Sequence, residues 1–165
     1  MDNEATVFVV DDDAAVLHSV ASALASRGMN AECFESADAF RQNVDATRPG
    51  CLIVDLKMPG MSGIQLLQQL KLEQDFRPAV VITGFAEIET VVQSMKLGAA
   101  DFLQKPFVPA QLIEAAQQAL EKDRRLRESR QAGEGARSKL ATLPKEEIAV
   151  MSRLARGLTN QQIAN

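Results

Sequence analysis

Residues 51–67 read CLIVDLKMPGMSGIQLL, a stretch that joins an apolar run to a helical pattern through a single aspartate. The run 51–54 is short and wholly apolar, which predicts a strand covered on both faces of its sheet. Between residues 63 and 72, apolar side chains recur at helical spacing, which predicts a helix with one inward face. Asp55 comes directly after the strand, so we expect its carboxylate at the carboxyl end of that strand.

The same alternation of short apolar runs and longer amphipathic runs extends in both directions from this stretch. Strands that alternate with helices predict βαβ units and therefore a parallel sheet of the α/β class. Ser36 is expected to cap the second helix. The expected strands are 6–10, 31–34, 51–54, 79–83 and 101–103, and the expected helices are 14–26, 37–44, 63–72, 87–97 and 109–120.

Polar side chains directly follow four of the five expected strands. Because the carboxyl ends of parallel strands share one edge of a sheet, residues far apart in the chain should meet there. Ligands bind at that edge in open α/β sheets, at the point where the strand order reverses. The residues concerned are 11–13, which are all Asp, then Asp55, Thr83 with Gly84, and Lys105 with Pro106.

Several carboxylates crowded at one edge repel one another unless a cation lies among them. Mg²⁺ suits such a set because it prefers oxygen ligands and is held by a few carboxylates together with several waters. A carboxylate can also attack phosphorus and become an acyl phosphate. The charge on the transferred group then needs a cation and hydrogen-bond donors, which Lys105 and Thr83 supply. The pattern therefore indicates phosphoryl transfer to Asp55.

Each of these residues also has an ordinary structural interpretation. The aspartates at 11–13 could simply cap the first helix, and we expect Asp13 to do so. A lysine before a proline is common in surface loops, and Thr83 alone is uninformative. The agreement of all four positions at one edge is what favours a shared site.

Four stretches, VFVVDDDAAV, CLIVDLKMPGMSGIQLL, VVITG and GAADFLQKPF, carry a resemblance to a known family. Residues 1–120 resemble the receiver domain of bacterial two-component response regulators, and the FixJ-like group in particular. The resemblance implies a flavodoxin-like (CheY-like), doubly wound, five-stranded parallel sheet with the strand order 2-1-3-4-5. It also implies a cis peptide bond between Lys105 and Pro106.

The same resemblance implies that the chain is a phosphorylated switch. Asp55 would accept a phosphoryl group from a sensor histidine kinase, and Thr83 and Lys105 would contact the phosphoryl oxygens. Thr83 and Phe102 would form the switch pair, and the face of the fourth helix and fifth strand would form a homodimer on phosphorylation. The chain would not be an enzyme beyond self-catalysed phosphoryl transfer and autodephosphorylation.

For the metal, the resemblance implies that Asp12, Asp55 and the carbonyl of Lys57 bind Mg²⁺ while Asp11 assists through water. A different class, a metal-dependent phosphatase of the haloacid-dehalogenase type, expects an aspartate two residues after the nucleophile, where this chain has Lys57. Phe85 stands where the FixJ-like group usually has histidine. It could shield the phosphoryl group from water, or it could be a surface aromatic.

The C-terminal part of the chain differs in composition from the rest. Residues 1–118 carry 8 basic and 16 acidic side chains, whereas residues 119–165 carry 10 basic and 6 acidic ones. We expect a helical extension and linker at 121–142. Residues 143–165, above all RLARGLTNQQIA, resemble the opening of a LuxR-type helix-turn-helix domain, although Pro144 and Ala149 depart from that pattern.

In the LuxR-type family a later recognition helix enters the major groove, and the sequence ends at Asn165 before that helix. We therefore expect a transcription-regulating output, with DNA bound only through the missing remainder of the helix-turn-helix domain. A stand-alone receiver that acts as a protein-binding or phosphorelay module is the alternative.

The composition narrows the class of protein further. No apolar run reaches the roughly 18 residues needed to span a bilayer, and the acidic N-terminus lacks the basic start of a signal peptide. We expect a cytoplasmic chain without membrane contact, in which Cys33 and Cys51 are buried free thiols.

Overall fold

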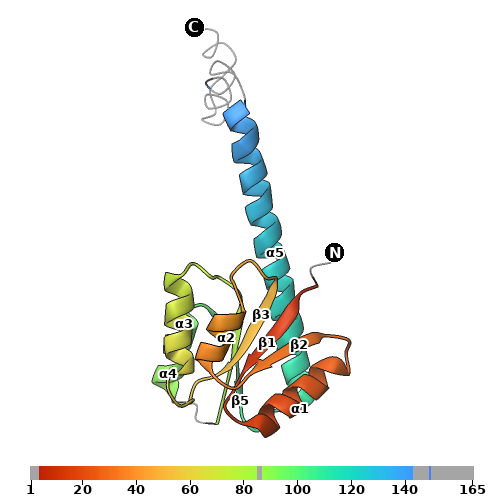
Figure 1. The fold of residues 1–165 in the computed structure, drawn as a ribbon, viewed down its shortest axis with the longest axis vertical. Helices are drawn as coiled ribbons and strands as arrows, with labels where there is room; N and C mark the ends of the chain where they lie inside the picture. The colour runs from red at the N-terminus through yellow and green to blue at the C-terminus, as the bar shows by residue number, and fades with distance from the viewer. Residues whose placement is uncertain (1–3, 85–86, 143–148, 150–165) are drawn as a thin grey trace. The chain divides into compact units, whose positions relative to one another are not determined.

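In the computed structural model, residues 4–84, 87–142 and 149 are described. Strands and helices alternate along the chain as the sequence predicts (Figure 1). The strands are β1 (Thr6–Val10), β2 (Asn30–Phe34), β3 (Gly50–Asp55), β4 (Ala79–Thr83) and β5 (Ala99–Gln104). The helices are α1 (Ala14–Ala25), α2 (Ala37–Asn43), α3 (Gly63–Leu72), α4 (Ile88–Lys96) and α5 (Pro109–Thr142).

The five strands form one parallel sheet with the order β2-β1-β3-β4-β5. The predicted fold class and strand order are therefore confirmed. Because the strands share one direction, they all end at one side of the sheet, which we call the carboxyl edge, and begin at the other, the amino edge. The cis bond between Lys105 and Pro106 is confirmed as well.

Two hydrophobic clusters hold the helices against the two faces of the sheet. One contains Phe8 of β1 with Phe40 of α2 and Leu66 of α3. The other contains Leu24 of α1 and Leu112 of α5. The inner strands β1, β3 and β4 are buried along their whole length, as wholly apolar runs predict, whereas the outer strands β2 and β5 are only partly buried.

Side-chain caps begin three of the helices. Asp13 Oδ1 accepts the backbone N–H groups of Ala15 and Val16, so Asp13 is the predicted cap of α1. Ser36 is the predicted cap of α2. Ser62 caps α3. These caps fix where each helix leaves its preceding loop, because they satisfy N–H groups that have no partner within the helix.

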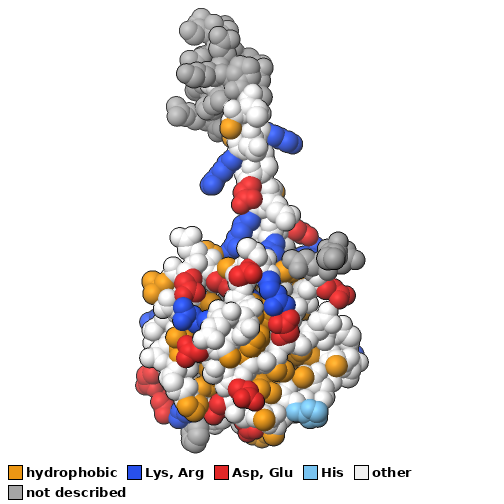
Figure 2. Space-filling model, in the orientation of Figure 1, with side chains coloured by type: hydrophobic (Ala, Val, Ile, Leu, Met, Phe, Trp, Pro, Cys, Tyr) orange, Lys and Arg blue, Asp and Glu red, His pale blue; other side chains and the backbone are white. Residues whose placement is uncertain are grey.

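Helix α5 is longer than its apolar pattern predicts. The pattern fades after residue 120, whereas the helix continues from Pro109 to Thr142. Its buried residues end at Asp123, and the residues beyond are mostly charged or small. Lys, Arg, Glu, Gln and Ala are good helix formers even where they offer no apolar face, which explains the extension. Figure 2 shows Lys and Arg side chains along this part of the helix.

The chain divides into two compact units, Met1–Arg125 and Leu126–Asn165. The expected helix-turn-helix segment at 143–165 lies outside the described residues except for Ala149. Within the described part of the chain, no helix is both long enough and apolar enough to cross a membrane.

The two cysteines are free thiols, as predicted, but they differ in exposure. Cys51 lies in the buried strand β3, and burial raises the pKa of its thiol to about 12. Cys33 is exposed, so the expectation of a buried thiol is wrong at this position. The reason is its place on β2, an outer strand that has a neighbour on one side only.

Candidate phosphoacceptor and metal site

The carboxyl edge brings together charged residues from three strands, as the sequence predicts. Asp11 follows β1, Asp55 ends β3, and Lys105 follows β5. Lys105 Nζ lies 2.8 Å from Asp11 Oδ2 and 3.4 Å from Asp55 Oδ2. Residues up to 94 positions apart in the chain therefore share one ion-paired cluster.

Asp12 completes a set of three carboxylates at this edge. One oxygen from each of Asp11, Asp12 and Asp55 lies within 4.8 Å of the others. Asp11 and Asp55 are buried, whereas Asp12 is exposed, so the set opens to solvent on one side. A hard divalent cation such as Mg²⁺ prefers oxygen donors and keeps several waters, and this set of donors fits it.

Backbone hydrogen bonds orient the two buried carboxylates. Asp11 Oδ1 accepts the N–H of Asp13 at 2.9 Å, and the Asp11 N–H donates to the carbonyl of Phe34 at 3.1 Å. Asp55 Oδ1 accepts the N–H of Lys57 at 3.4 Å. The chain therefore turns back toward Asp55 at Lys57, while the side chain of Lys57 is exposed.

Thr83 is the last residue of β4 and reaches the same edge. It is buried, and its carbonyl accepts the N–H of Lys105 at 2.8 Å. Phe102 lies on the neighbouring strand β5, in register with Val81, and packs against the apolar cluster on the α2 and α3 face. Phe85 lies outside the described residues, so its role stays a hypothesis.

Burial and the neighbouring charges together set the pKa values in this cluster. Burial raises the pKa of Asp55, and Asp11 adds to that rise, while Lys105 opposes it. For Lys105, burial lowers the pKa, but the hydrogen bonds and charges of Asp11 and Asp55 outweigh burial, so the pKa is raised. Lys105 therefore keeps its positive charge. A further cation close to Asp55 would favour the ionised form of its carboxylate.

Two residues that contact the ends of β3 are not singled out by the sequence. Gly63 packs against the backbone of Asp55, and Asp123 accepts the N–H of Gly50 at 2.8 Å where β3 begins. A glycine after a serine, and one acidic residue in a charged run, are weak signals by themselves. The structural roles of Gly63 and Asp123 depend on contacts with residues distant in the chain.

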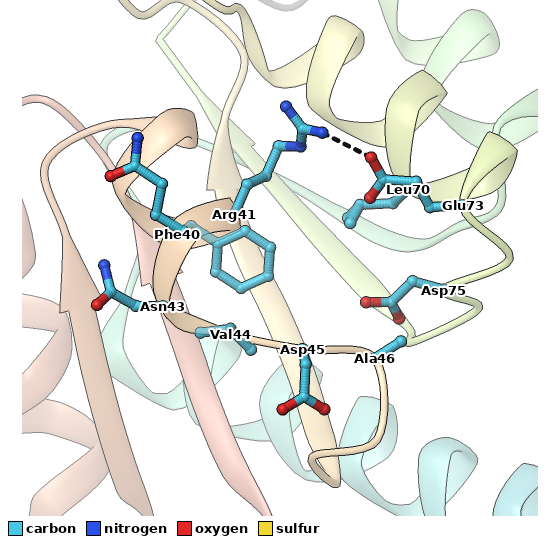
Figure 3. A pocket seen from close by; sticks show the side chains of 10 residues that line it. Phe40, Arg41, Asn43, Val44, Asp45, Ala46, Leu70, Glu73 and Asp75 are labelled. Atoms are coloured by element: carbon cyan, nitrogen blue, oxygen red, sulfur yellow. Dashed lines mark hydrogen bonds and ion pairs between the residues drawn. The ribbon is translucent and has the colours of Figure 1, made fainter.

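A cavity of about 340 Å³ lies between the ends of α2 and α3, on the side of the sheet where β3 and β4 begin (Figure 3). Phe40 and Leu70 contribute apolar lining, and Arg41 pairs with Glu73 at 2.6 Å beside it. The residues that line this cavity are different from those of the carboxyl-edge cluster. The cavity is therefore separate from the candidate site.

Comparisons with known proteins agree with this geometry. The response regulator receiver domain family matches residues 7–117. Transcriptional regulatory protein FixJ of Bradyrhizobium diazoefficiens is 34% identical over 164 residues, which cover 99% of this chain and 80% of FixJ. Response regulator protein TodT of Pseudomonas putida is 35% identical over 163 residues, which cover 99% of this chain and 72% of TodT.

Solved structures of response regulators are also similar to this chain. The low-resolution structure of response regulator StyR has a TM-score of 0.85 and 38% identity, and the match covers 98% of this chain and 81% of that one. The structure of FixJ-N has a TM-score of 0.67 and 40% identity, with 72% of this chain and 94% of that one covered. The chain therefore belongs to the response regulator receiver family and is similar to FixJ-like transcriptional regulators.

Proposed function

We propose that this chain is a receiver that accepts a phosphoryl group on Asp55 from a sensor histidine kinase and switches a transcription-regulating output. The observation that carries the proposal is the cluster in which Lys105 Nζ lies 3.4 Å from Asp55 and 2.8 Å from Asp11. Family membership supports it, because receiver domains of transcriptional response regulators pair with sensor kinases.

Asp55 would be the nucleophile. A bond forms between one of its carboxylate oxygens and phosphorus, while the bond from phosphorus to the donor breaks and its electron pair leaves with the donor. The transferred group then lies beside the ammonium of Lys105, which Asp11 holds in place. The Thr83 hydroxyl would donate to a phosphoryl oxygen. The proposed activity is self-modification, not repeated turnover of a substrate.

Mg²⁺ would be held by Asp12, Asp55 and the carbonyl of Lys57, with Asp11 assisting through water. The support for this assignment is a donor set made only of oxygens, three of which lie within 4.8 Å of one another. When bound, the ion supplies positive charge that offsets both the carboxylates and the phosphoryl oxygens.

Thr83 and Phe102 would form the switch. Movement of Thr83 toward a phosphoryl oxygen would let the half-buried Phe102 repack, which biases an existing equilibrium between two forms. Helix α4 exposes an apolar stripe made of Ile88, Val92 and Met95, and a second copy of the chain would bury this stripe when phosphorylation induces a dimer. Equal sedimentation with and without beryllofluoride would contradict the dimer.

The proposed organisation is a receiver at 1–120, a helical extension and linker at 121–142, and the start of a LuxR-type helix-turn-helix domain at 143–165. The continuous helix α5 supports the middle part. DNA would be bound only through the remainder of the helix-turn-helix domain, because the recognition helix comes later in that family. A cytoplasmic location fits this role.

Labelling with acetyl phosphate in the presence of Mg²⁺ tests the proposal. The native chain should gain a phosphoryl group, and Asp55→Asn should gain none, because an amide is a poor nucleophile toward phosphorus. Asp38→Asn removes an exposed aspartate of α2 and is the matched control, which should be labelled as the native chain is. Labelling that survives in Asp55→Asn would overturn the proposal.

A further inference from the structure

The first turn of α3 packs directly on the backbone of the phosphoacceptor. Gly63 is buried, and its N–H donates to the carbonyl of Leu56 at 3.1 Å. A Cβ atom added to Gly63 would lie 2.3 Å from the carbonyl oxygen of Asp55 and 2.9 Å from the Cα of Leu56. Both neighbours are backbone atoms, so no side-chain rotation could relieve such a contact. Any side chain here must displace the main chain.

The two sides of this contact are held in place by other interactions. Asp55 pairs in register with Ile82 of β4 and is buried, so the end of β3 is fixed on the sheet. The first turn of α3 is ordered by a capping box, in which Ser62 Oγ accepts the N–H of Gln65 at 3.2 Å and Gln65 Oε1 accepts the N–H of Ser62 at 2.9 Å. The buried Leu66 holds the helix on the sheet through the apolar cluster that also contains Phe8. A displacement would therefore fall on the loop between them, residues 56–62.

That loop carries Lys57, whose N–H donates to Asp55 Oδ1 and whose carbonyl is the proposed metal ligand. We propose that Gly63 is a positioning residue for Mg²⁺, because its missing side chain lets α3 pack on the backbone of Asp55 and Leu56 and so holds the loop that carries Lys57 beside the Asp55 carboxylate. This inference rests on the proposed function. It assigns to Gly63 an effect on metal affinity that acts through other residues, not through contact with the ion.

Mg²⁺ binding to the whole chain without a phosphoryl donor, measured by calorimetry or by titration of backbone amide resonances, tests this inference. Gly63→Ala should bind Mg²⁺ about tenfold or more weakly, as residues that orient metal ligands typically do. Gly133→Ala is the matched control, because a Cβ at that helical glycine meets no atom within 4 Å. It should bind Mg²⁺ as the native chain does. Thermal unfolding of each variant shows whether the fold is retained.

A second variant keeps the test decisive if Gly63→Ala does not fold. Ser62→Ala adds no atoms and only loosens the first turn of α3, so it should retain the fold and weaken Mg²⁺ binding by about threefold. Native Mg²⁺ affinity in a folded Gly63→Ala, or in Ser62→Ala, overturns the inference while the proposed function stands. A native chain that neither binds Mg²⁺ nor becomes labelled at Asp55 overturns the proposed function and this inference with it.

Discussion

Charged side chains lie close together at both edges of the sheet. At the carboxyl edge carboxylates outnumber the cation that pairs with them, whereas at the amino edge each arginine has its own carboxylate partner. At the carboxyl edge, three carboxylates lie close together, and the ammonium group of Lys105 pairs with two of them, Asp11 and Asp55. At the amino edge, each guanidinium has a carboxylate of its own, since Arg77 pairs with Asp75 and Arg48 pairs with Glu32. An excess of carboxylates is unfavourable until a cation enters, which suits a binding site. A cluster in which each arginine already has a carboxylate partner suits a structural role.

The ring of Phe8, in the middle of β1, lies beside both of these guanidinium groups. The Cζ atoms of Arg48 and Arg77 each lie 4.9 Å from the centre of its ring, a distance at which cation–π attraction operates. Arg77 is wholly buried, and its Nη2 also donates to the carbonyl of Asp45 at 2.8 Å. Two guanidinium groups beside one ring would repel each other, and the carboxylate partner of each offsets this repulsion.

The largest expected effect that tests this comparison is at Arg77. Arg77→Met removes a guanidinium whose side chain is 0% exposed and leaves the carboxylate of Asp75, 7% exposed, without its ion-pair partner. We expect the free energy of unfolding to fall by about 3–5 kcal/mol, the range for breaking a buried ion pair. Urea unfolding measures this. Arg41→Met is the control, because its pair with Glu73 is partly exposed and should be worth less than about 1 kcal/mol. Equal losses of unfolding free energy in Arg77→Met and Arg41→Met would contradict the expected difference between the buried and the exposed pair.

A smaller effect is expected where α5 meets the start of β3. Asp123→Ala leaves the buried N–H of Gly50 without the carboxylate that accepts it at 2.8 Å. We expect a loss of about 1–3 kcal/mol in the free energy of unfolding, with faster hydrogen exchange at the Gly50 amide. Lys122→Ala, at the exposed neighbouring position, should change neither quantity appreciably. Unchanged exchange at Gly50 in Asp123→Ala would show that this hydrogen bond does not hold the amino edge.

The carboxyl edge could be predicted from the sequence because its signals are local. An apolar run followed by Asp55, and another followed by Lys105, are each visible within a few residues. The parallel topology then requires that the ends of such strands meet, so a general rule of the fold turned separate signals into one cluster. The 2.8 Å and 3.4 Å contacts of Lys105 agree with that prediction.

The ion pairs of the amino edge could not be predicted in this way, because the roles of these residues depend on contacts with residues far away in the sequence. Arg77 and Arg48 look like solvated loop residues until the ring of Phe8 lies beside both. Asp123 belongs to a charged run without an apolar period, so neither its burial nor the length of α5 follows from hydrophobic pattern. Gly63 gives no sign in the sequence of its approach to the Asp55 backbone.

The burial of Asp55 at the carboxyl edge predicts that removing its charge stabilises the fold. Because burial raises the pKa of Asp55 above the ordinary value of 3.8, the folded chain favours the protonated form more than the unfolded chain does. The ionised form therefore destabilises the fold above the raised pKa, and this penalty is absent below 3.8. In buffer without Mg²⁺, Asp55→Asn should unfold at a higher temperature than the native chain near about pH 7, by a margin that shrinks toward about pH 4. A margin that does not change with pH would contradict this account.

The smallest effect is expected at the exposed pair of the amino edge. The Arg48 hydrogen bond lowers the pKa of Glu32, so the stabilisation is present above the ordinary value of 4.5 and is lost as the pH falls through the lowered pKa. The side chains of Arg48 and Glu32 are 33% and 44% exposed, so solvent screens their attraction. Glu32→Gln should therefore lower the free energy of unfolding by less than about 1 kcal/mol, and salt should reduce the difference.

Urea unfolding at low and high salt measures the effect of Glu32→Gln, with Glu35→Gln at an exposed position as the control. A loss as large as that of Arg77→Met would mean that the two guanidinium groups act as one unit through the ring of Phe8. The amino edge would then be a coupled network instead of two independent pairs. In that case the contrast with the carboxyl edge would lie in how strongly the charges are connected, and not only in whether each has a partner.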